Sequence, residues 1–69
     1  MPNYVSNVKE HREREGWSQE ALARELGVSR QTIVNIEKGI SEPRVLLAIA
    51  LAATLGVAIE QLFRKGTTP

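Results

Sequence analysis

Apolar residues in this chain recur every three or four positions, and no segment alternates apolar with polar residues. A spacing of three or four residues places side chains on one face of a helix, whereas alternation is typical of a half-buried strand. Glu, Arg, Ala and Leu, which favour helices, are frequent throughout the chain. The pattern therefore predicts an all-α fold.

Glycines divide the chain into five periodic segments. Each of the five glycines follows one segment, at a place where a helix commonly ends in the left-handed conformation that glycine adopts freely. The expected helices cover about residues 7–15, 18–26, 29–38, 44–55 and 58–65, packed as a compact five-helix bundle. A short terminal β pairing of Tyr4 and Val5 with residues near Phe63 is also compatible with the sequence.

The expected helix starts differ in the quality of their caps. Asn7 with Glu10 three residues later fits a capping box, in which two side chains satisfy free backbone amides. Pro43 pushes the preceding residue out of helical geometry, so the fourth helix is expected to begin near Arg44. Ala58 stands where a capping hydroxyl is preferred, which costs about 1 kcal/mol. The fifth helix is therefore expected to be short.

The second and third helices form the best-defined unit of the chain. Ser18 and Ser29 are expected N-caps, and only Gly27 and Val28 lie between the second helix and the cap of the third. A connection this short suits two helices that cross steeply, as in a helix-turn-helix, and not an antiparallel hairpin. The unit covers residues 19–38, and its inward positions are Leu22, Ala23, Leu26, Val28, Ile33 and Ile36.

The third helix presents a polar stripe on its outward side. Because Ile33 and Ile36 point inward, helical spacing places the polar side chains of this helix outside. Arginine can pair with two acceptors of guanine, glutamine and asparagine match adenine, and a valine methyl can contact thymine. The predicted base-reading residues are Arg30, Gln31, Val34 and Asn35. Thr32 and Lys38 flank them, and solvated polar residues without a ligand are the alternative interpretation for any single position.

Residues 18–39, SQEALARELGVSRQTIVNIEKG, resemble the helix-turn-helix of the lambdoid phage repressor and Cro family, also called the xenobiotic-response-element family. The resemblance extends from about Val8 to Phe63 and is strongest to short stand-alone repressors such as the cytolysin repressor. It implies a homodimeric DNA-binding domain on a pseudo-palindromic operator. Two copies of the third helix would enter successive major grooves about 34 to 36 Å apart.

The resemblance also implies roles for individual residues. The family's base-reading positions fall on Arg30, Gln31 and Asn35, and its phosphate contact at the start of the second helix falls on Gln19. Arg44 matches a residue that approaches the DNA backbone or the minor groove. The expected contacts to the DNA backbone are Gln19, Ser29, Thr32, Lys38 and Arg44.

Two further sites concern charges near the third helix. Arg12 and Glu37 match a buried arginine and glutamate pair of the family, which links the first helix to the third and orients the latter. Glu42 departs from the family pattern, because relatives often carry a basic or amide side chain there. A carboxylate that faces DNA would repel phosphates.

The fourth helix is more apolar than one buried face requires. Its expected core positions are Val45, Ala48, Leu51, Ala52 and Leu55, which leaves Leu46, Leu47, Ala50 and Ala53 on the other side. An exposed apolar stripe usually has a partner. We expect a homodimer interface made by Leu46, Ala50, Ala53, Ile59 and Phe63. The alternatives are an antitoxin-like or coactivator-like module that docks a different protein here, or surface alanines that only favour helix formation.

Composition alone does not indicate a DNA-binding protein. Nine Lys and Arg against eight Asp and Glu give a net charge of +1, so the positions of the charges carry the argument. Without cysteine and with His11 as the single histidine, neither a metal site nor a cofactor is expected. No nucleophile, base and acid set can be assembled, so we expect no enzyme.

The length of 69 residues is enough for one domain, which we place at residues 1–69 with a core at about 8–63. The longest uncharged stretch, residues 45–59, is broken by Thr54 and Gly56 and is shorter than the roughly 20 apolar residues of a membrane span. Residues 1–7 lack a signal-peptide pattern. The sequence therefore predicts a cytoplasmic, sequence-specific regulator of transcription that binds double-stranded DNA, most simply a repressor.

Overall fold

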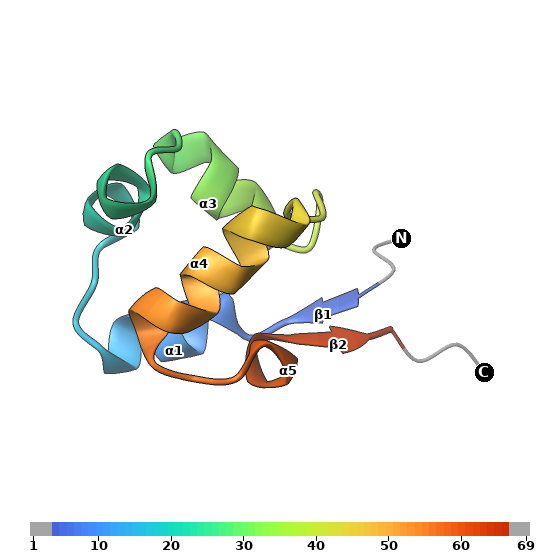
Figure 1. The fold of residues 1–69 in the computed structure, drawn as a ribbon. Helices are drawn as coiled ribbons and strands as arrows, with labels where there is room; N and C mark the ends of the chain where they lie inside the picture. Colours follow the sequence, from blue (N-terminus) through green and yellow to red (C-terminus); the bar gives the residue numbers. More distant parts are fainter. Residues whose placement is uncertain (1–3, 67–69) are drawn as a thin grey trace.

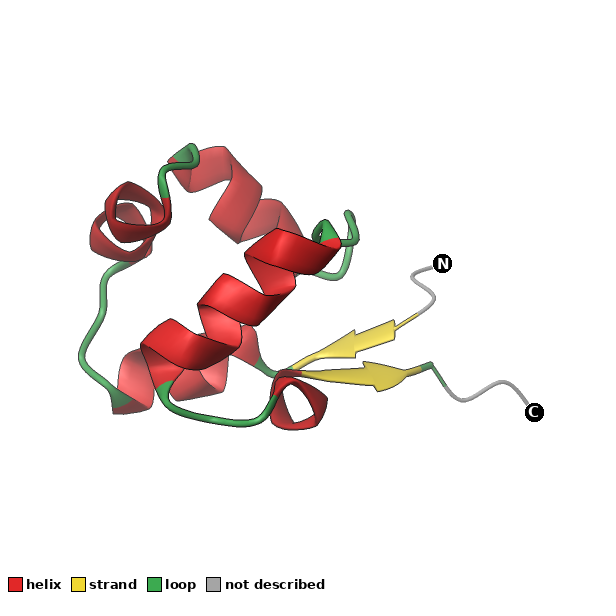
Figure 2. Ribbon diagram, in the orientation of Figure 1, coloured by secondary structure: helices red, strands yellow, loops and turns green. Residues whose placement is uncertain are grey.

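Residues 4–66, which the computed structural model describes, form five helices and a two-stranded ribbon (Figures 1 and 2). The remaining terminal residues lie outside this description. The elements follow one another as β1 (Tyr4–Ser6), α1 (Val8–Arg14), α2 (Gln19–Leu26), α3 (Arg30–Glu37), α4 (Val45–Leu55), α5 (Ile59–Leu62) and β2 (Phe63–Lys65). The all-α prediction with a short terminal β pairing is confirmed.

The caps of α2 and α3 are those expected from the sequence. The Ser18 hydroxyl accepts a hydrogen bond from the Ala21 amide at 3.0 Å, and the Ser29 hydroxyl accepts one from the Thr32 amide at 3.1 Å. Gly27 ends α2 with a φ of 71°, a left-handed conformation that glycine adopts without a Cβ penalty. These local features turn the chain sharply, and α2 and α3 cross steeply in Figure 1.

The expected capping box at Asn7 is wrong. The Asn7 side chain makes no capping hydrogen bond to α1 and instead donates to the Gln61 carbonyl at 3.4 Å. The Asn7 backbone amide donates to the Leu62 carbonyl at 2.8 Å. Asn7 therefore joins the start of α1 to the end of α5, because both terminal strands leave the helical body at this point.

The expected fifth helix over residues 58–65 is also too long. The structure ends α5 at Leu62, and the next three residues pair antiparallel with β1 in the register Tyr4↔Lys65, Val5↔Arg64 and Ser6↔Phe63. Gly66 thus follows a strand and not a helix. At the start of α5, Ala58 provides no side-chain cap, but its amide donates to Gln61 Oε1 at 2.8 Å. This bond replaces part of the missing cap.

The core lies where α1 to α5 meet. Its largest fully buried side chains are Val8, Leu22, Ile33, Ile36, Leu51 and Leu62. Trp17, Leu26 and Val28 pack against this cluster from the ends of the helix-turn-helix. Since α2 and α3 bury their apolar sides in the same cluster, the outer side of α3 is held in a fixed direction.

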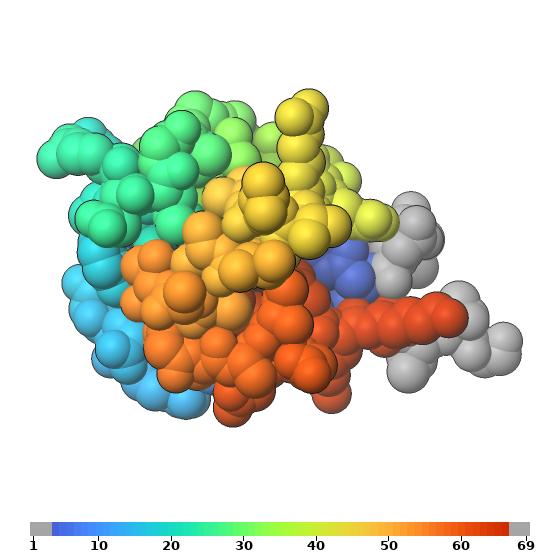
Figure 3. All heavy atoms as spheres, viewed as in Figure 1, coloured from blue at the N-terminus to red at the C-terminus, as the bar shows by residue number. Residues whose placement is uncertain are grey.

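Two positions of α4 are corrected by the structure. Val45, expected in the core, is 72% exposed, whereas Leu47, expected outside, is half-buried and packs against the core. The reason is helical spacing: Leu47 lies one turn before Leu51, and the first residue of α4 projects beyond the core. Figure 3 shows α4, in yellow to orange, across the middle of this face of the molecule.

Candidate nucleic-acid interface

The outer side of α3 carries the residues that were predicted to read bases. Arg30 and Gln31 are exposed in its first turn, and Val34 and Asn35 are half-buried one turn later. Gln31 Nε2 donates to Asn35 Oδ1 at 2.9 Å, so the two amides are already aligned along one side of the helix. Such a pair presents both donors and acceptors, which are the groups that the major groove distinguishes.

The residues predicted to contact the DNA backbone surround this stripe. Ser29 Oγ and Thr32 Oγ1 lie 2.9 Å apart at the start of α3, and Lys38 is exposed directly after its end. Both hydroxyls remain on the outer surface, where an O–H group can also donate to a phosphate oxygen. Gln19 is the first residue of the neighbouring helix α2, and Arg44 is the N-cap residue of α4.

A buried ion pair fixes α3 to the rest of the domain. Arg12 Nε lies 2.5 Å from Glu37 Oε2, and these side chains are only 9% and 5% exposed. Arg12 Nη1 also donates to the Trp17 carbonyl at 2.8 Å, and Gln19 Nε2 donates to Glu37 Oε1 at 2.9 Å. The carboxylate therefore joins α1, α2 and the end of α3.

The contact between Gln19 and Glu37 was not anticipated from the sequence. Gln19 was expected to point toward a phosphate, yet one of its two amide hydrogens is used inside the domain. The second hydrogen and the carbonyl oxygen remain for an outside ligand. The two residues are 18 positions apart, so no local spacing rule connects them.

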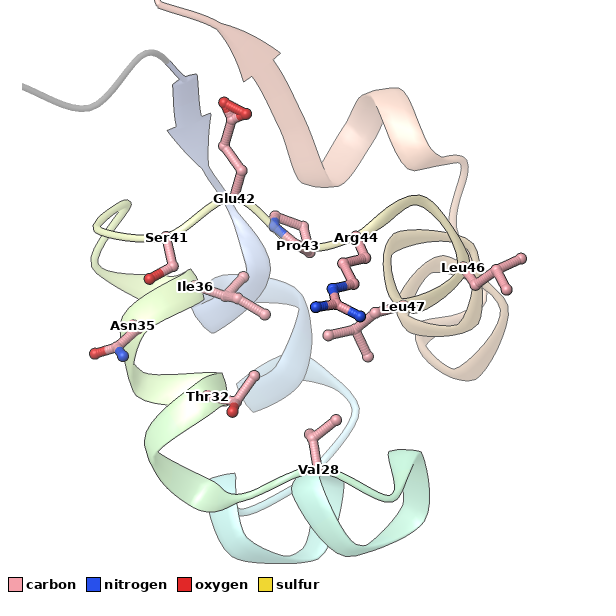
Figure 4. A pocket seen from close by; sticks show the side chains of 10 residues that line it. All are labelled: Val28, Thr32, Asn35, Ile36, Ser41, Glu42, Pro43, Arg44, Leu46 and Leu47. Carbon is pink, nitrogen blue, oxygen red and sulfur yellow. The ribbon is translucent and has the colours of Figure 1, made fainter.

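A groove runs between α3 and the start of α4 (Figure 4). It has a volume of about 480 Å³, and Val28, Ile36 and Leu47 contribute apolar side chains to its lining. The Arg44 side chain extends over the groove toward α3, whereas the Glu42 carboxylate points away from it (Figure 4). The repulsion expected from Glu42 is thereby reduced, because its charge is directed away from the α3 side chains.

The Glu42 carboxylate acts instead on Tyr4. Burial raises the pKa of the Tyr4 hydroxyl, and the nearby negative charge of Glu42 raises it further. A raised pKa favours the protonated phenol in the folded state. Its contribution to stability is therefore present below the unfolded pKa of about 10 and is lost as the pH rises through the folded pKa.

This shift is testable because Tyr4 is the single tyrosine of the chain. We expect the phenolate absorbance of the folded protein to appear at higher pH than that of the denatured chain. Glu42→Gln should move the folded midpoint part of the way back, because burial is the larger cause. A folded midpoint at or below the denatured one would contradict this environment.

Two other kinds of site were searched for in the described residues. Within residues 4–66, no group of three His, Cys, Asp or Glu side chains is placed to hold a metal ion. None of the helices in the same range is both long and apolar enough to span a membrane. The groups gathered around α3 are hydroxyls, amides and cations, which bind polar and anionic ligands.

Known proteins are similar to this chain in sequence and in structure. Residues 8–62 match the HTH_3 family, described as Helix-turn-helix. An uncharacterized HTH-type transcriptional regulator of Methanocaldococcus jannaschii is 47% identical over 58 residues, which cover 84% of this chain and 88% of that protein. The uncharacterized HTH-type transcriptional regulator YgzD of Bacillus subtilis is 43% identical over 58 residues, which again cover 84% of this chain and 88% of that protein.

Solved structures agree with the sequence relatives. A hypothetical transcription factor from Neisseria, NHTF, superposes with a TM-score of 0.74 at 36% identity. The superposition covers 86% of this chain and 68% of the Neisseria chain. The SOS-response repressor LexA of Eubacterium rectale gives a TM-score of 0.77 at 28% identity, over 91% and 72% of the two chains. The chain thus belongs to the HTH_3 family of lambda repressor and Cro-like helix-turn-helix transcriptional regulators.

Proposed function

We propose that this chain is a transcriptional repressor that binds a pseudo-palindromic operator as a homodimer, with one copy of α3 in each of two successive major grooves. The observation that carries the proposal is the outer side of α3, where guanidinium and amide side chains lie together. The inner side of the same helix is anchored by two buried isoleucines and the Glu37 ion pair. A rigid helix with a base-reading side is what direct readout requires.

Each base-reading residue has its own task in this proposal. Arg30, in the first turn, donates two hydrogen bonds to a guanine edge, and Gln31 with Asn35 reads adenine or a neighbouring pair through the aligned amides. Val34 lies between them and contacts a thymine methyl. These contacts discriminate between sequences, since each base pair presents a different set of groups in the major groove.

A second set of residues binds phosphates and sets the position of α3. Ser29 and Thr32 donate from their hydroxyls, Lys38 and Arg44 supply charge, and Gln19 uses its remaining amide hydrogen. The net charge of +1 does not oppose this role. Glu37 is buried and paired, and the Glu42 carboxylate points away from the α3 groove, whereas the Arg44 guanidinium lies over it (Figure 4).

The second copy of the chain would bind the apolar side of α4. Leu46 is 80% exposed and Ile49 is 53% exposed, and Ala53 continues the same stripe at helical spacing. Ile49 was missed from the sequence, although its spacing from Leu46 is three residues. The full proposed interface is Leu46, Ile49, Ala50, Ala53, Ile59 and Phe63, with Val45 at its edge.

The structure supports this choice of surface in a second way. Beside the stripe, a groove of about 290 Å³ lies between the start of α4 and the α5–β2 segment, and its lining includes Pro43, Ile59 and Phe63. A two-fold interface pairs a surface with itself, so protruding residues such as Leu46 need a recess of this kind nearby. Small monomers are marginally stable, and a partner would bury this area.

Repression follows if the dimer occupies a promoter and blocks polymerase. The role needs no catalytic step and no cofactor, and we place it in the cytoplasm. The test is selection of duplexes from a random pool by the full chain, followed by stoichiometry and a salt titration. A two-fold symmetric motif bound by two chains, with steep salt dependence, is expected. No enrichment at low salt would instead favour a protein partner on α4.

Arg30→Ala should weaken binding to the selected operator by about 1 to 3 kcal/mol and relax the preference at one base pair of each half-site. The reason is the loss of a bidentate contact, while the fold stays intact because Arg30 is exposed. Titration against an array of single-base variants measures both effects. Arg14→Ala removes an equal charge from an exposed position at the end of α1 and should leave the base preferences unchanged. An unaltered specificity profile for Arg30→Ala would remove Arg30 from the base-reading set.

A further inference from the structure

Tyr4 connects the terminal ribbon to the segment that follows α3. Its hydroxyl lies within hydrogen-bond distance of two carbonyl oxygens, those of Ser41 and, at 3.4 Å, Ile36. Its ring packs edge to face on Phe63, with ring centroids 5.7 Å apart and an interplanar angle of 71°. Because a phenol has one hydrogen to donate, the shorter contact, to Ser41, ties β1 to the segment 39–44, and it does so beside the Ile36 carbonyl in the last turn of α3, more than 30 positions away in the sequence.

The segment 39–44 has few other means of being held. Ile40 and Ser41 both donate their amides to the Asn35 carbonyl, at 2.9 and 3.5 Å, which fixes only the first part of the segment. Gly39 is buried and Pro43 is half-buried near the two ends of the segment, whereas Ile40, Ser41 and Glu42 between them are exposed, so burial contributes little to the order of its middle. Segments with few buried contacts open at low free-energy cost, and the Tyr4 hydroxyl bonds a carbonyl at the middle of this one.

The segment also determines where Arg44 stands. Arg44 is the N-cap residue of α4, two residues beyond Glu42, and its side chain extends over the groove beside α3 (Figure 4). Its backbone is extended, with φ −66° and ψ 156°. The path of residues 41–43 therefore sets the direction in which the Arg44 side chain leaves the chain.

We propose that Tyr4 is a positioning residue for DNA binding: its hydroxyl holds segment 39–44 against the end of α3 and so aims Arg44 at a DNA phosphate. The terminal ribbon is then a part of the binding machinery, because pairing with β2 and the Phe63 ring hold Tyr4 in place. This inference rests on the proposed function for its DNA contact, and on the structure of the free chain for the link between Tyr4 and the segment.

Tyr4→Phe tests the link in the free protein. The variant keeps the ring that packs on Phe63 and removes only the hydroxyl, so the fold should be kept, with a fall in the thermal midpoint of about 3 to 10 °C, the size expected for one hydrogen bond in a domain this small. We expect the exchange rates of the Ile40 and Ser41 amides to rise about three- to tenfold, the size expected for one hydrogen bond. Val5→Thr is the matched control. Val5 lies on the same strand but points to the opposite face, and threonine keeps a β-branched side chain there. Unchanged exchange rates in Tyr4→Phe would overturn the proposal.

The DNA contact is tested on the duplex that the wild-type chain selects. Tyr4→Phe should lower affinity about three- to tenfold and reduce the slope of log K against log salt by about 0.9, the value for one phosphate contact. In an Arg44→Ala background, Tyr4→Phe should have no further effect, because its action passes through Arg44. A full additional loss in that background, or an unchanged slope, would overturn the assignment to Arg44.

The two arms separate this inference from the proposed function. If the wild-type chain enriches no duplex, both the proposed function and the proposed DNA contact of Arg44 are wrong. The amide exchange rates in Tyr4→Phe still decide whether Tyr4 holds the segment 39–44. If the wild-type chain binds its operator and the segment loosens without loss of affinity, the proposed function stands and Tyr4 is only a structural residue.

Discussion

Glu37→Gln should lower the free energy of unfolding by about 3 kcal/mol, the lower end of what removing one member of a buried ion pair costs. The variant keeps the shape of the side chain but leaves the Arg12 guanidinium, 9% exposed, with only the exposed and more distant Glu13 carboxylate, at 3.9 Å, as a counter-charge. For a domain of this size, the thermal midpoint should fall by about 12 to 24 °C. Chemical and thermal denaturation of the full chain measure both values.

An exposed pair in the same chain provides the control. Arg24 and Glu20 also form an ion pair, at 3.3 Å, but their side chains are 78% and 72% exposed. Glu20→Gln makes the same chemical change and should cost less than about 0.5 kcal/mol, because solvent screens the pair. An equal cost at both sites would contradict the burial argument.

The double variant Arg12→Met, Glu37→Leu separates charge pairing from packing. It removes both buried charges at once, and replacements of this kind recover most of the loss caused by a single change. Recovery will be incomplete here, since Gln19 and the Trp17 carbonyl also lose their partners. The DNA affinity of this variant then reports how much the orientation of α3 depends on the pair, independently of stability.

The parts of the fold that follow from local rules were predictable from the sequence. Ser18 and Ser29 act as caps, and the inward positions of α2 and α3 follow helical spacing. Local rules extended the fifth helix to residue 65, whereas it ends at Leu62, because the strand that follows depends on pairing with β1, nearly sixty positions earlier. The sequence was compatible with that pairing but did not give the point at which the helix stops. Asn7 also failed as a cap through distant contacts, because its backbone amide and its side chain donate to the Leu62 and Gln61 carbonyls at the end of α5.

In the candidate site, too, features set by local spacing were predicted and contacts between distant segments were not. The stripe of α3 could be derived from Ile33 and Ile36, since one buried side of a helix determines the other. The contacts Gln19–Glu37 and Tyr4–Ser41 join distant segments, and no spacing in the sequence indicates them. On α4, Val45 was misplaced because hydrophobicity does not show how far a helix extends beyond its core.

Leu46→Glu should dissociate the proposed homodimer and weaken operator binding by about 10²- to 10⁴-fold, because two half-sites are then no longer bound by one linked pair of α3 helices. The monomer fold should be unaffected, since Leu46 is 80% exposed. Sedimentation measures the change in oligomeric state, and titration of the operator measures the affinity of the same sample.

Leu46→Lys distinguishes dissociation from simple repulsion of DNA. Leu46 lines the groove beside Arg44, so a carboxylate there would oppose phosphates even in an intact dimer. A lysine reverses this electrostatic effect but is equally costly to bury without a partner. If α4 forms the interface, both variants are monomers and both lose cooperative operator binding. A Leu46→Lys variant that stays dimeric and binds the operator at least as tightly as wild type would move the dimer interface to another surface.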